Sequence, residues 1–209
     1  MALLLHPAFF APVIQYVAMA VEEQIVFEKE DNFQKQTYRN RCYIYGANGK
    51  QLLTVPIRHS RSEGRQKTKD LRIDNSFSWR KHMVKSLESS YRSSPYFEFY
   101  EDDIMEVFDR KYEFLMDLNL HAGEVVADCL QLERSISFTD MYEKDPKLSK
   151  DCRYLIEAKG EVLYPFESYT QVFGEKHGFL NNLSILDLLF NEGTNSHDYL
   201  LAHRHLLGL

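Results

Sequence analysis

The sequence predicts an α+β fold in which a mixed β-sheet from the N-terminal third carries a largely helical C-terminal half packed on it. Short apolar runs separated by turn signals fill the chain up to Val55, a pattern typical of strands. From Trp79 onward, large apolar residues recur three or four positions apart, which is the period of an amphipathic helix. With 209 residues, 44% of them hydrophobic, the chain is long enough for a substantial core. Because it contains no repeat, low-complexity tract or linker, we expect one domain over residues 1–209.

The first elements predict a strand–helix–strand unit. Leu3 to Leu5 is a short apolar strand that stops before Pro7. Pro12 stands where a helix can begin, since the first helical position tolerates proline, and the helix would continue to Ala20. Residues 25–27 read as the next strand. This spacing favours a compact βαβ unit with a parallel strand pair.

A hairpin is expected next. Residues 42–45 and 52–55 flank the segment Gly46-Ala47-Asn48-Gly49, and Asn-Gly supplies the positive φ angles that tight hairpin turns require. The polar, basic segment 60–70 predicts a mobile loop, and residues 71–73 predict a short strand.

Helices follow. Trp79, Met83, Leu87 and Tyr91 fall on one face of a helix that Pro95 would end. Residues 96–132 carry further helical patterns, whereas 140–169 predict loops with one or two short strands. Residues 182–191 predict an apolar helix, with Ser184 and Asp187 at capping-box spacing and Gly193 as the stop.

Cysteine usage and the N-terminal segment favour a cytoplasmic location. Three dispersed cysteines are too few for a disulfide scaffold. The apolar start of the chain has no basic residue before Lys29, whereas a signal peptide needs a positively charged beginning. Pro7, Pro12 and Gln15 interrupt the same stretch, so we expect no membrane span.

Charge is distributed unevenly along the chain. The net charge is −6, with a sequence pI near 5.8, which argues against a general nucleic-acid binder because such proteins neutralise phosphates. Residues 35–92, however, hold 14 Lys and Arg against 4 Asp and Glu, a net +10. A basic segment in an acidic protein can concentrate anionic ligands. The alternative is that these cations pair with the acidic remainder in the folded chain.

Several motifs together resemble one bacterial family. They are Lys35-Gln36-Thr37-Tyr38-Arg39-Asn40-Arg41, Ala47-Asn48-Gly49 with Leu53-Thr54-Val55-Pro56-Ile57, Trp79 and His82, Tyr91 with Pro95-Tyr96-Phe97 and Tyr100, and Gln171-Val172-Phe173 with Phe179 and the segment 182–193. The chain is therefore similar to the WbqC-like family, named for a member encoded among O-antigen genes. The resemblance implies a setting in bacterial surface-polysaccharide synthesis and no particular reaction. Many relatives read His-Gln-Pro near the start, where this chain reads His6-Pro7 without the glutamine.

The candidate substrate-binding residues come mainly from the basic segment. Arginine can bind phosphate or carboxylate with two parallel hydrogen bonds. We expect Lys35, Arg39, Arg41 and Lys69 to bind an anionic group, with Tyr38 and Asn40 orienting the substrate. Asp187, inside an apolar helix, could anchor Arg39 or Arg41, or could form a capping box with Ser184.

His82 is the candidate catalytic residue. It follows Trp79, a further candidate for substrate binding, by three positions on the same helix face, and a histidine there could move a proton. The alternative is a histidine at the edge of the core.

His6 is a second candidate functional residue, since it would lie at the carboxyl end of the first strand, where open α/β sheets bind ligands. The alternative is a histidine packed beside Pro7.

The sequence predicts no metal site. The acidic run 101–103 and the three histidines of the C-terminal segment (His197, His203 and His205) are better explained without a metal ion. The sequence contains no P-loop, dinucleotide-binding fingerprint, HExxH or GxSxG motif and leaves any cofactor unspecified.

The leading hypothesis is a transferase acting on a nucleotide-sugar or another activated anionic precursor of surface polysaccharide. A second hypothesis is a non-catalytic scaffold that uses the basic residues to bind an acidic partner or a glycan intermediate. Single-stranded RNA binding through Tyr38, Tyr43 and Tyr45 is disfavoured by the acidic remainder of the chain.

Overall fold

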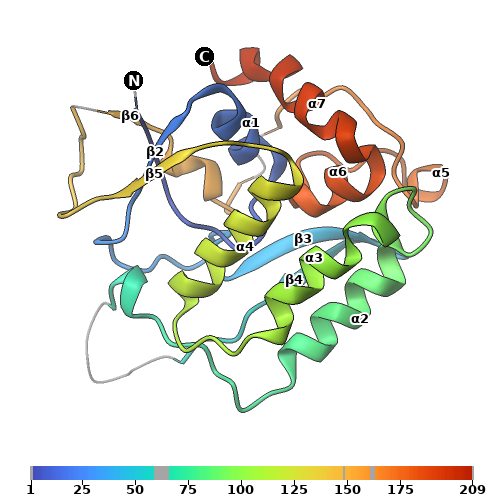
Figure 1. The fold of residues 1–209 in the computed structure, drawn as a ribbon, viewed down its shortest axis with the longest axis horizontal. Coiled ribbons are helices and arrows are strands. Elements are labelled where there is room, and N and C mark those ends of the chain that lie inside the picture. The colour runs from blue at the N-terminus through green and yellow to red at the C-terminus, as the bar shows by residue number, and fades with distance from the viewer. Residues whose placement is uncertain (1, 59–65, 148, 161–162, 209) are drawn as a thin grey trace.

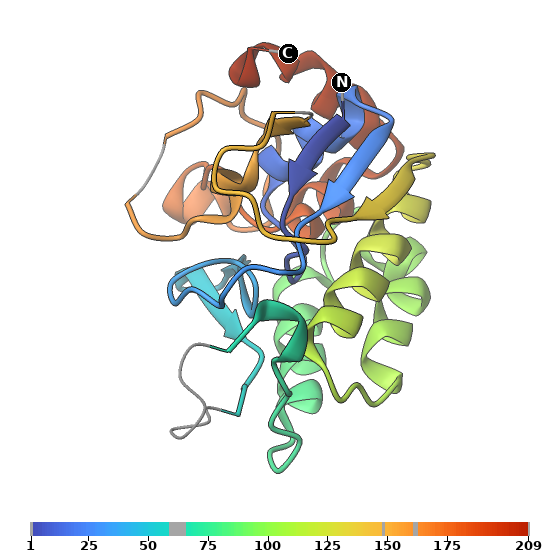
Figure 2. The same cartoon turned by 90° about the vertical axis from the view of Figure 1, so that its left-hand side faces the viewer.

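The computed structural model describes residues 2–58, 66–147, 149–160 and 163–208. Four strands, β1 (Ala2–Leu5), β2 (Gln24–Phe27), β5 (Ser135–Phe138) and β6 (Ser149–Asp151), form one sheet in the order β5-β2-β1-β6. All three strand pairs are parallel. A separate antiparallel hairpin, β3 (Arg41–Gly46) and β4 (Gly49–Thr54), lies beside this sheet (Figures 1 and 2). The predicted α+β class is confirmed.

Helices pack on both the parallel sheet and the hairpin. α1 (Val13–Val21) is buried except for its last residue and contacts α6 (Ile185–Glu192) and α7 (Ser196–Ala202). α2 (Trp79–Tyr91), α3 (Phe97–Asp109) and α4 (Leu115–Cys129) lie side by side over the hairpin and the sheet (Figure 1). α5 (Gly174–His177) is a single turn in the C-terminal loop. Among the described residues, no helix combines the length and apolar character needed to cross a bilayer.

The predicted βαβ unit is confirmed, with Leu3 paired to Ile25 and α1 beginning directly after Pro12. The hairpin is confirmed as well: Gly46 pairs with Gly49 around a two-residue turn, and Gly49 adopts the positive φ of 98°. The aromatic face of α2 is buried as predicted, and Gly193 caps α6.

Two expectations differ from the structure. Residues 71–73 make isolated bridges, Ile73 to Ile57 and Arg72 to Phe114, and do not form a strand, because each residue meets a different partner segment. The outer strands come from the second half of the chain: β6 lies in the segment 140–169, for which one or two short strands were predicted, whereas β5 was not predicted. Of the predicted mobile loop, residues 60–65 lie outside the described residues, and Thr68–Asp70 forms a 3-10 turn (η1).

Gly193 provides a test of the closing helix. Its φ of 56° lies in the left-handed region, and a Cβ at this position would collide with the ring of Tyr96. We expect Gly193→Ala to destabilise the fold by more than about 1–2 kcal/mol, the usual cost of the left-handed conformation in a residue with a Cβ. Gly123→Ala, within α4 and with open space around its Cβ, should instead be stabilising by about 0.4–1 kcal/mol. Urea unfolding of both variants measures this difference; a neutral Gly193→Ala would contradict it.

Candidate functional site

A polar cavity of about 280 Å³ opens at the carboxyl ends of the parallel strands. Strand order reverses at β1, because β2 and β5 lie on one side of it and β6 on the other. Open parallel sheets bind ligands at such a switch point, outside the carboxyl ends of the strands. His6 directly follows β1, and Asp151 ends β6. Both line the cavity, which is therefore the candidate site.

A buried ion pair forms one wall. Arg39 and Asp31 have side chains only 1% and 3% exposed, and the Arg39 Nη2 lies 2.5 Å from Asp31 Oδ2. The same Arg39 nitrogen donates to His6 Nε2 at 2.9 Å, while Nη1 donates to Thr37 Oγ1 at 3.1 Å. Thr68 Oγ1 donates to the other Asp31 oxygen at 2.7 Å. Burial lowers the pKa of Arg39 and the charge of Asp31 opposes that shift, while Arg39 Nε is buried without a hydrogen-bond partner among the described residues.

A second arginine forms the opposite wall. Arg153 follows β6 in the 3-10 turn Arg153–Ile156 (η2). It donates to both carboxylate oxygens of Asp151, at 2.9 and 2.7 Å, and to Glu28 Oε2 at 3.3 Å. Glu28 directly follows β2 and is fully buried. Asp151 is exposed, and hydrogen bonds from Arg153 lower its pKa against the opposing effect of burial. Arg153 thus joins the carboxyl ends of β2 and β6 across β1.

His6 is neutral in this network. Arginine can only donate, so His6 Nε2 must accept the hydrogen bond from Arg39. Burial lowers the pKa of His6 well below 6.5, and the charges of Arg39 and Arg153 lower it further. The His6 carbonyl accepts from Gln15 Nε2 at 3.0 Å, which ties the turn after β1 to α1.

A short antiparallel contact separates this cavity from a neighbouring cleft. Tyr38 N donates to the Ile156 carbonyl at 2.8 Å, and Ala158 N donates to the Gln36 carbonyl at 2.9 Å. Successive side chains of an extended segment point to opposite sides. Thr37 and Arg39 accordingly line the cavity, whereas Tyr38 lines the cleft.

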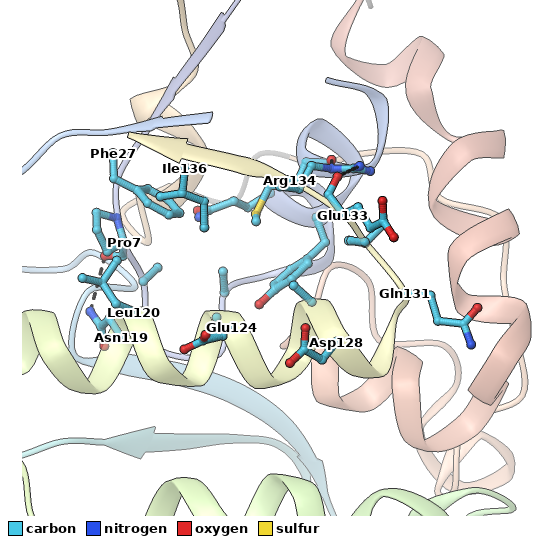
Figure 3. Close-up of a pocket in the computed structure, with 18 residues that line it drawn as sticks. Pro7, Phe27, Asn119, Leu120, Glu124, Asp128, Gln131, Glu133, Arg134 and Ile136 are labelled. Carbon is cyan, nitrogen blue, oxygen red and sulfur yellow. Dashed lines mark hydrogen bonds between the residues drawn. The ribbon is translucent and has the colours of Figure 1, made fainter. Parts of the chain in front are cut away.

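A larger hollow lies elsewhere, between the sheet and α4, and measures about 760 Å³ (Figure 3). Glu124 and Asp128 extend into it from α4, opposite Ile136 of β5 (Figure 3). Asn119 Nδ2 donates to the Pro7 carbonyl at its end. No residue predicted to bind substrate lines this hollow.

Comparison with known proteins identifies the chain. The profile of the WbqC-like protein family matches residues 7–164, about three quarters of the sequence. The chain belongs to the WbqC-like family. It is also 25% identical to the uncharacterized protein Rv1507c of Mycobacterium tuberculosis, over 86% of this chain and 88% of that protein. No solved structure matches the chain. The matched residues include the whole segment 35–41 and end before α6.

This WbqC-like protein brings one of its predicted anion-binding residues, Arg39, into the cavity. Lys35 is exposed in the adjoining loop. Arg41 is half-buried at the start of β3, beyond Asn40, whose amide donates to the Val55 carbonyl at 3.0 Å. Lys69 is held by Glu30 at 2.7 Å, and this bond with that from Lys67 lowers the pKa of Glu30 to about 2. Alternation along the chain therefore separates residues that the motif groups together.

The remaining predicted residues lie away from the cavity. Trp79 is buried in the core against Phe108. His82 is exposed and is not among the residues lining the cavity. Its helix, α2, lies on the other side of the molecule from β6 (Figure 1).

Asp187 is fully buried, but its partners are not the arginines. Tyr91 and Tyr169 hydroxyls donate to it at 2.8 and 2.6 Å, and Gln171 donates at 2.7 Å. Ser184 caps α6 by accepting from Leu186 N rather than through a reciprocal bond with Asp187. Asp187 thus links α6 to α2 and the C-terminal loop.

Four charged residues of the buried hydrogen-bond network were not anticipated: Glu28, Asp31, Asp151 and Arg153. Glu28 carried a usable signal, since it is an acidic residue directly after a predicted strand. Asp151 and Arg153 lay in a segment of weak periodicity, and no local pattern marked them. Within the described residues, no group of three or more His, Cys, Asp and Glu is arranged to hold a metal ion.

Removing one partner of the Arg39–Asp31 pair should strongly destabilise the fold. Asp31→Asn leaves Arg39 buried without its counter-charge, which typically costs about 3–5 kcal/mol. Glu113→Gln, which breaks the exposed ion pair with Arg72, is the matched control and should change stability by about 1 kcal/mol or less. If Asp31→Asn and Glu113→Gln lowered the free energy of unfolding in urea equally, burial of the Arg39–Asp31 pair would have no effect on stability.

His6 predicts a pH dependence of stability. Its folded pKa is lowered, so below about pH 6.5 the unfolded chain binds a proton that the folded chain excludes. Stability therefore decreases as the pH falls through 6.5, by up to about 1.4 kcal/mol per pH unit for this one group. His6→Gln keeps an acceptor for Arg39 and should lack that component. The test is unfolding of both proteins at pH 7 and pH 5.5; identical pH dependence would contradict the assignment.

Proposed function

We propose that this WbqC-like protein is a transferase acting on a nucleotide-sugar or another activated anionic precursor in bacterial surface-polysaccharide synthesis. The observation that carries the proposal is the convergence of Arg39, Arg153 and His6 on a cavity at the switch point of a parallel sheet. Membership in the WbqC-like family supports a role in bacterial surface-polysaccharide synthesis, as the resemblance implies. The location that we propose is the cytoplasm, as expected from the dispersed cysteines.

The charges of the cavity suggest how an anionic group would bind. Arg39 is almost completely buried, and its two terminal nitrogens donate to Asp31, His6 and Thr37, so it orients the wall of the cavity. Lys144 is exposed at the rim, and its carbonyl accepts from Arg153 at 3.1 Å. We assign the direct contact with a phosphate to Lys144, with Arg153, only 9% exposed and paired with Asp151 and Glu28, contributing its charge from the cavity wall.

Such an arrangement can promote group transfer by stabilising the leaving group. As the bond between the transferred carbon and the phosphate oxygen breaks, its electron pair stays on the phosphate. Fixed cations beside that oxygen stabilise the developing charge without reorganising, which is a large catalytic effect in enclosed sites. Neutral His6 adds no charge of its own and holds Arg39 in place.

The basic residues 35–92 give the scaffold hypothesis less support. Lys67 and Lys69 both pair with Glu30, and Arg72 pairs with Glu113. These described cations are neutralised by neighbours in the fold, so they are not a free surface for an acidic partner.

The proposal predicts stabilisation by the donor. A thermal-shift screen against UDP-, GDP-, CDP- and dTDP-sugars should raise the melting temperature with at least one compound, since a ligand at 100 times its Kd adds about 2.7 kcal/mol. Lys144→Gln should weaken that shift without altering the melting temperature of the free protein. His82→Gln is the comparison: it should leave the shift unchanged if the cavity, not α2, is the site. No shift with any donor would contradict the proposal, and so would a shift lost in His82→Gln but kept in Lys144→Gln.

A further inference from the structure

A cleft lined by aromatic rings lies next to the polar cavity. It measures about 330 Å³, close to the lower limit of roughly 300 Å³ for ligand pockets. Five rings from separate segments line it: Tyr38, Tyr43, Tyr154, Tyr164 and Phe179. Nothing in the proposed phosphate contact uses these rings.

The rings are held in fixed positions. Tyr38 and Tyr43 meet edge to face, with centroids 6.1 Å apart and planes at 80°. Lys50 Nζ lies 4.5 Å from the centroid of Tyr43. Phe179 packs edge to face on Tyr169 at 5.2 Å. Tyr154 is 49% exposed at the opening, so the cleft is preformed and accessible.

Polar groups stand among the rings. Asn181 donates through its amide nitrogen to the Tyr164 carbonyl, while its Oδ1 is buried and has no hydrogen-bond partner among the described residues. A buried acceptor of this kind calls for a donor. Glu157 and Lys50 add an exposed carboxylate and an ammonium group.

We propose that this cleft binds a saccharide, which is the acceptor of the transfer. A sugar ring has faces of polarised C–H groups and a rim of hydroxyls. Aromatic faces carry negative charge density, which suits the C–H faces, and the hydroxyls can donate to Asn181 and Glu157. That the saccharide is the acceptor of the transfer rests on the proposed function, whereas saccharide binding itself does not depend on it.

The two hollows adjoin. Tyr154 and Glu157 line both of them, and the contact of Thr37 with Glu157 forms the partition. A saccharide in the cleft would present a hydroxyl to Glu157 at the edge of the cavity. Glu157 takes that proton, the acceptor oxygen forms the new bond to the transferred carbon, and the nucleoside diphosphate leaves with the electron pair of the broken bond. Glu157 is therefore the catalytic base that the structure assigns.

The binding experiment uses saturation-transfer NMR with galactose, N-acetylglucosamine and rhamnose, each without a donor, and with UDP as a separate probe. At least one sugar should give a signal with the unmodified protein. Tyr43→Leu should reduce it at least tenfold, whereas Tyr43→Phe, which keeps the ring, should retain it. Tyr154→Ser alters a half-exposed ring that the fold does not need and should also reduce it. Phe99→Leu, an exposed aromatic residue on α3, is the matched control and should have no effect.

The outcomes separate the two proposals. No signal with any sugar, or equal signals for Tyr43→Leu and Tyr43→Phe, overturns the saccharide site. Loss of UDP binding in Tyr43→Leu also overturns it, because the rings would then stack a nucleobase. Sugar binding that survives while no nucleotide-sugar binds would refute the transferase and leave the saccharide site standing.

Glu157 has its own test once a turnover assay exists. Glu157→Gln should keep the sugar signal and lower the turnover number by about 10²–10⁴-fold, the usual contribution of a general base. Lys159→Gln, an exposed neighbour outside both hollows, should leave turnover unchanged. Unchanged turnover in Glu157→Gln would show that Glu157 is not the catalytic base.

Discussion

The buried ion pair between Arg39 and Asp31 fixes the geometry of everything around the site. Two charges removed from water need each other and further hydrogen bonds, and here Thr37, Thr68 and His6 supply them. These partners come from four segments: the turn after β1, the loop after β2, the segment 35–41 and the turn η1. The ion pair therefore joins four pieces of chain at the carboxyl edge of the sheet, with Thr68 bonded to Asp31 and the other partners to Arg39.

This arrangement also changes how the charge asymmetry should be understood. The net +10 of residues 35–92 suggested a basic surface, yet Arg39, Lys67, Lys69 and Arg72 are paired within the fold. The cations assigned to the ligand, Lys144 and Arg153, come instead from the part of the chain that is acidic overall. Local charge density along a sequence is a poor guide to surface potential when the acidic partners come from loops on either side of the segment.

Local patterns predicted local structure well. The apolar run at Leu3 to Leu5, the proline at position 12 and the Asn48-Gly49 turn each specify a few neighbouring residues, and these elements were confirmed. The sheet order could not be predicted, since β5 and β6 are short, carry few apolar residues and join β2 and β1 across more than a hundred positions. The same separation hid Arg153, whose contact with Glu28 spans 125 residues. The helical period around His82 correctly predicted a helix. Trp79, three residues earlier on the same predicted face, is buried, but His82 itself is exposed.

The segment Thr37-Tyr38-Arg39 shows why residues close in sequence can serve different parts of one site. Its extended backbone pairs with Ile156 to Ala158, so Thr37 and Arg39 face the cavity and Tyr38 the cleft. A slip of one residue in this pairing would exchange the two sides, which would bring Tyr38 to Asp31 and leave Arg39 among aromatic rings without a counter-charge. The ion pair makes that alternative costly. Gln36 enters the segment at a positive φ of 59°, a conformation that costs a residue with a Cβ about 1–2 kcal/mol. The need to keep Arg39 beside Asp31 thus sets a register in which charge and aromatic surface stand on opposite sides of one partition.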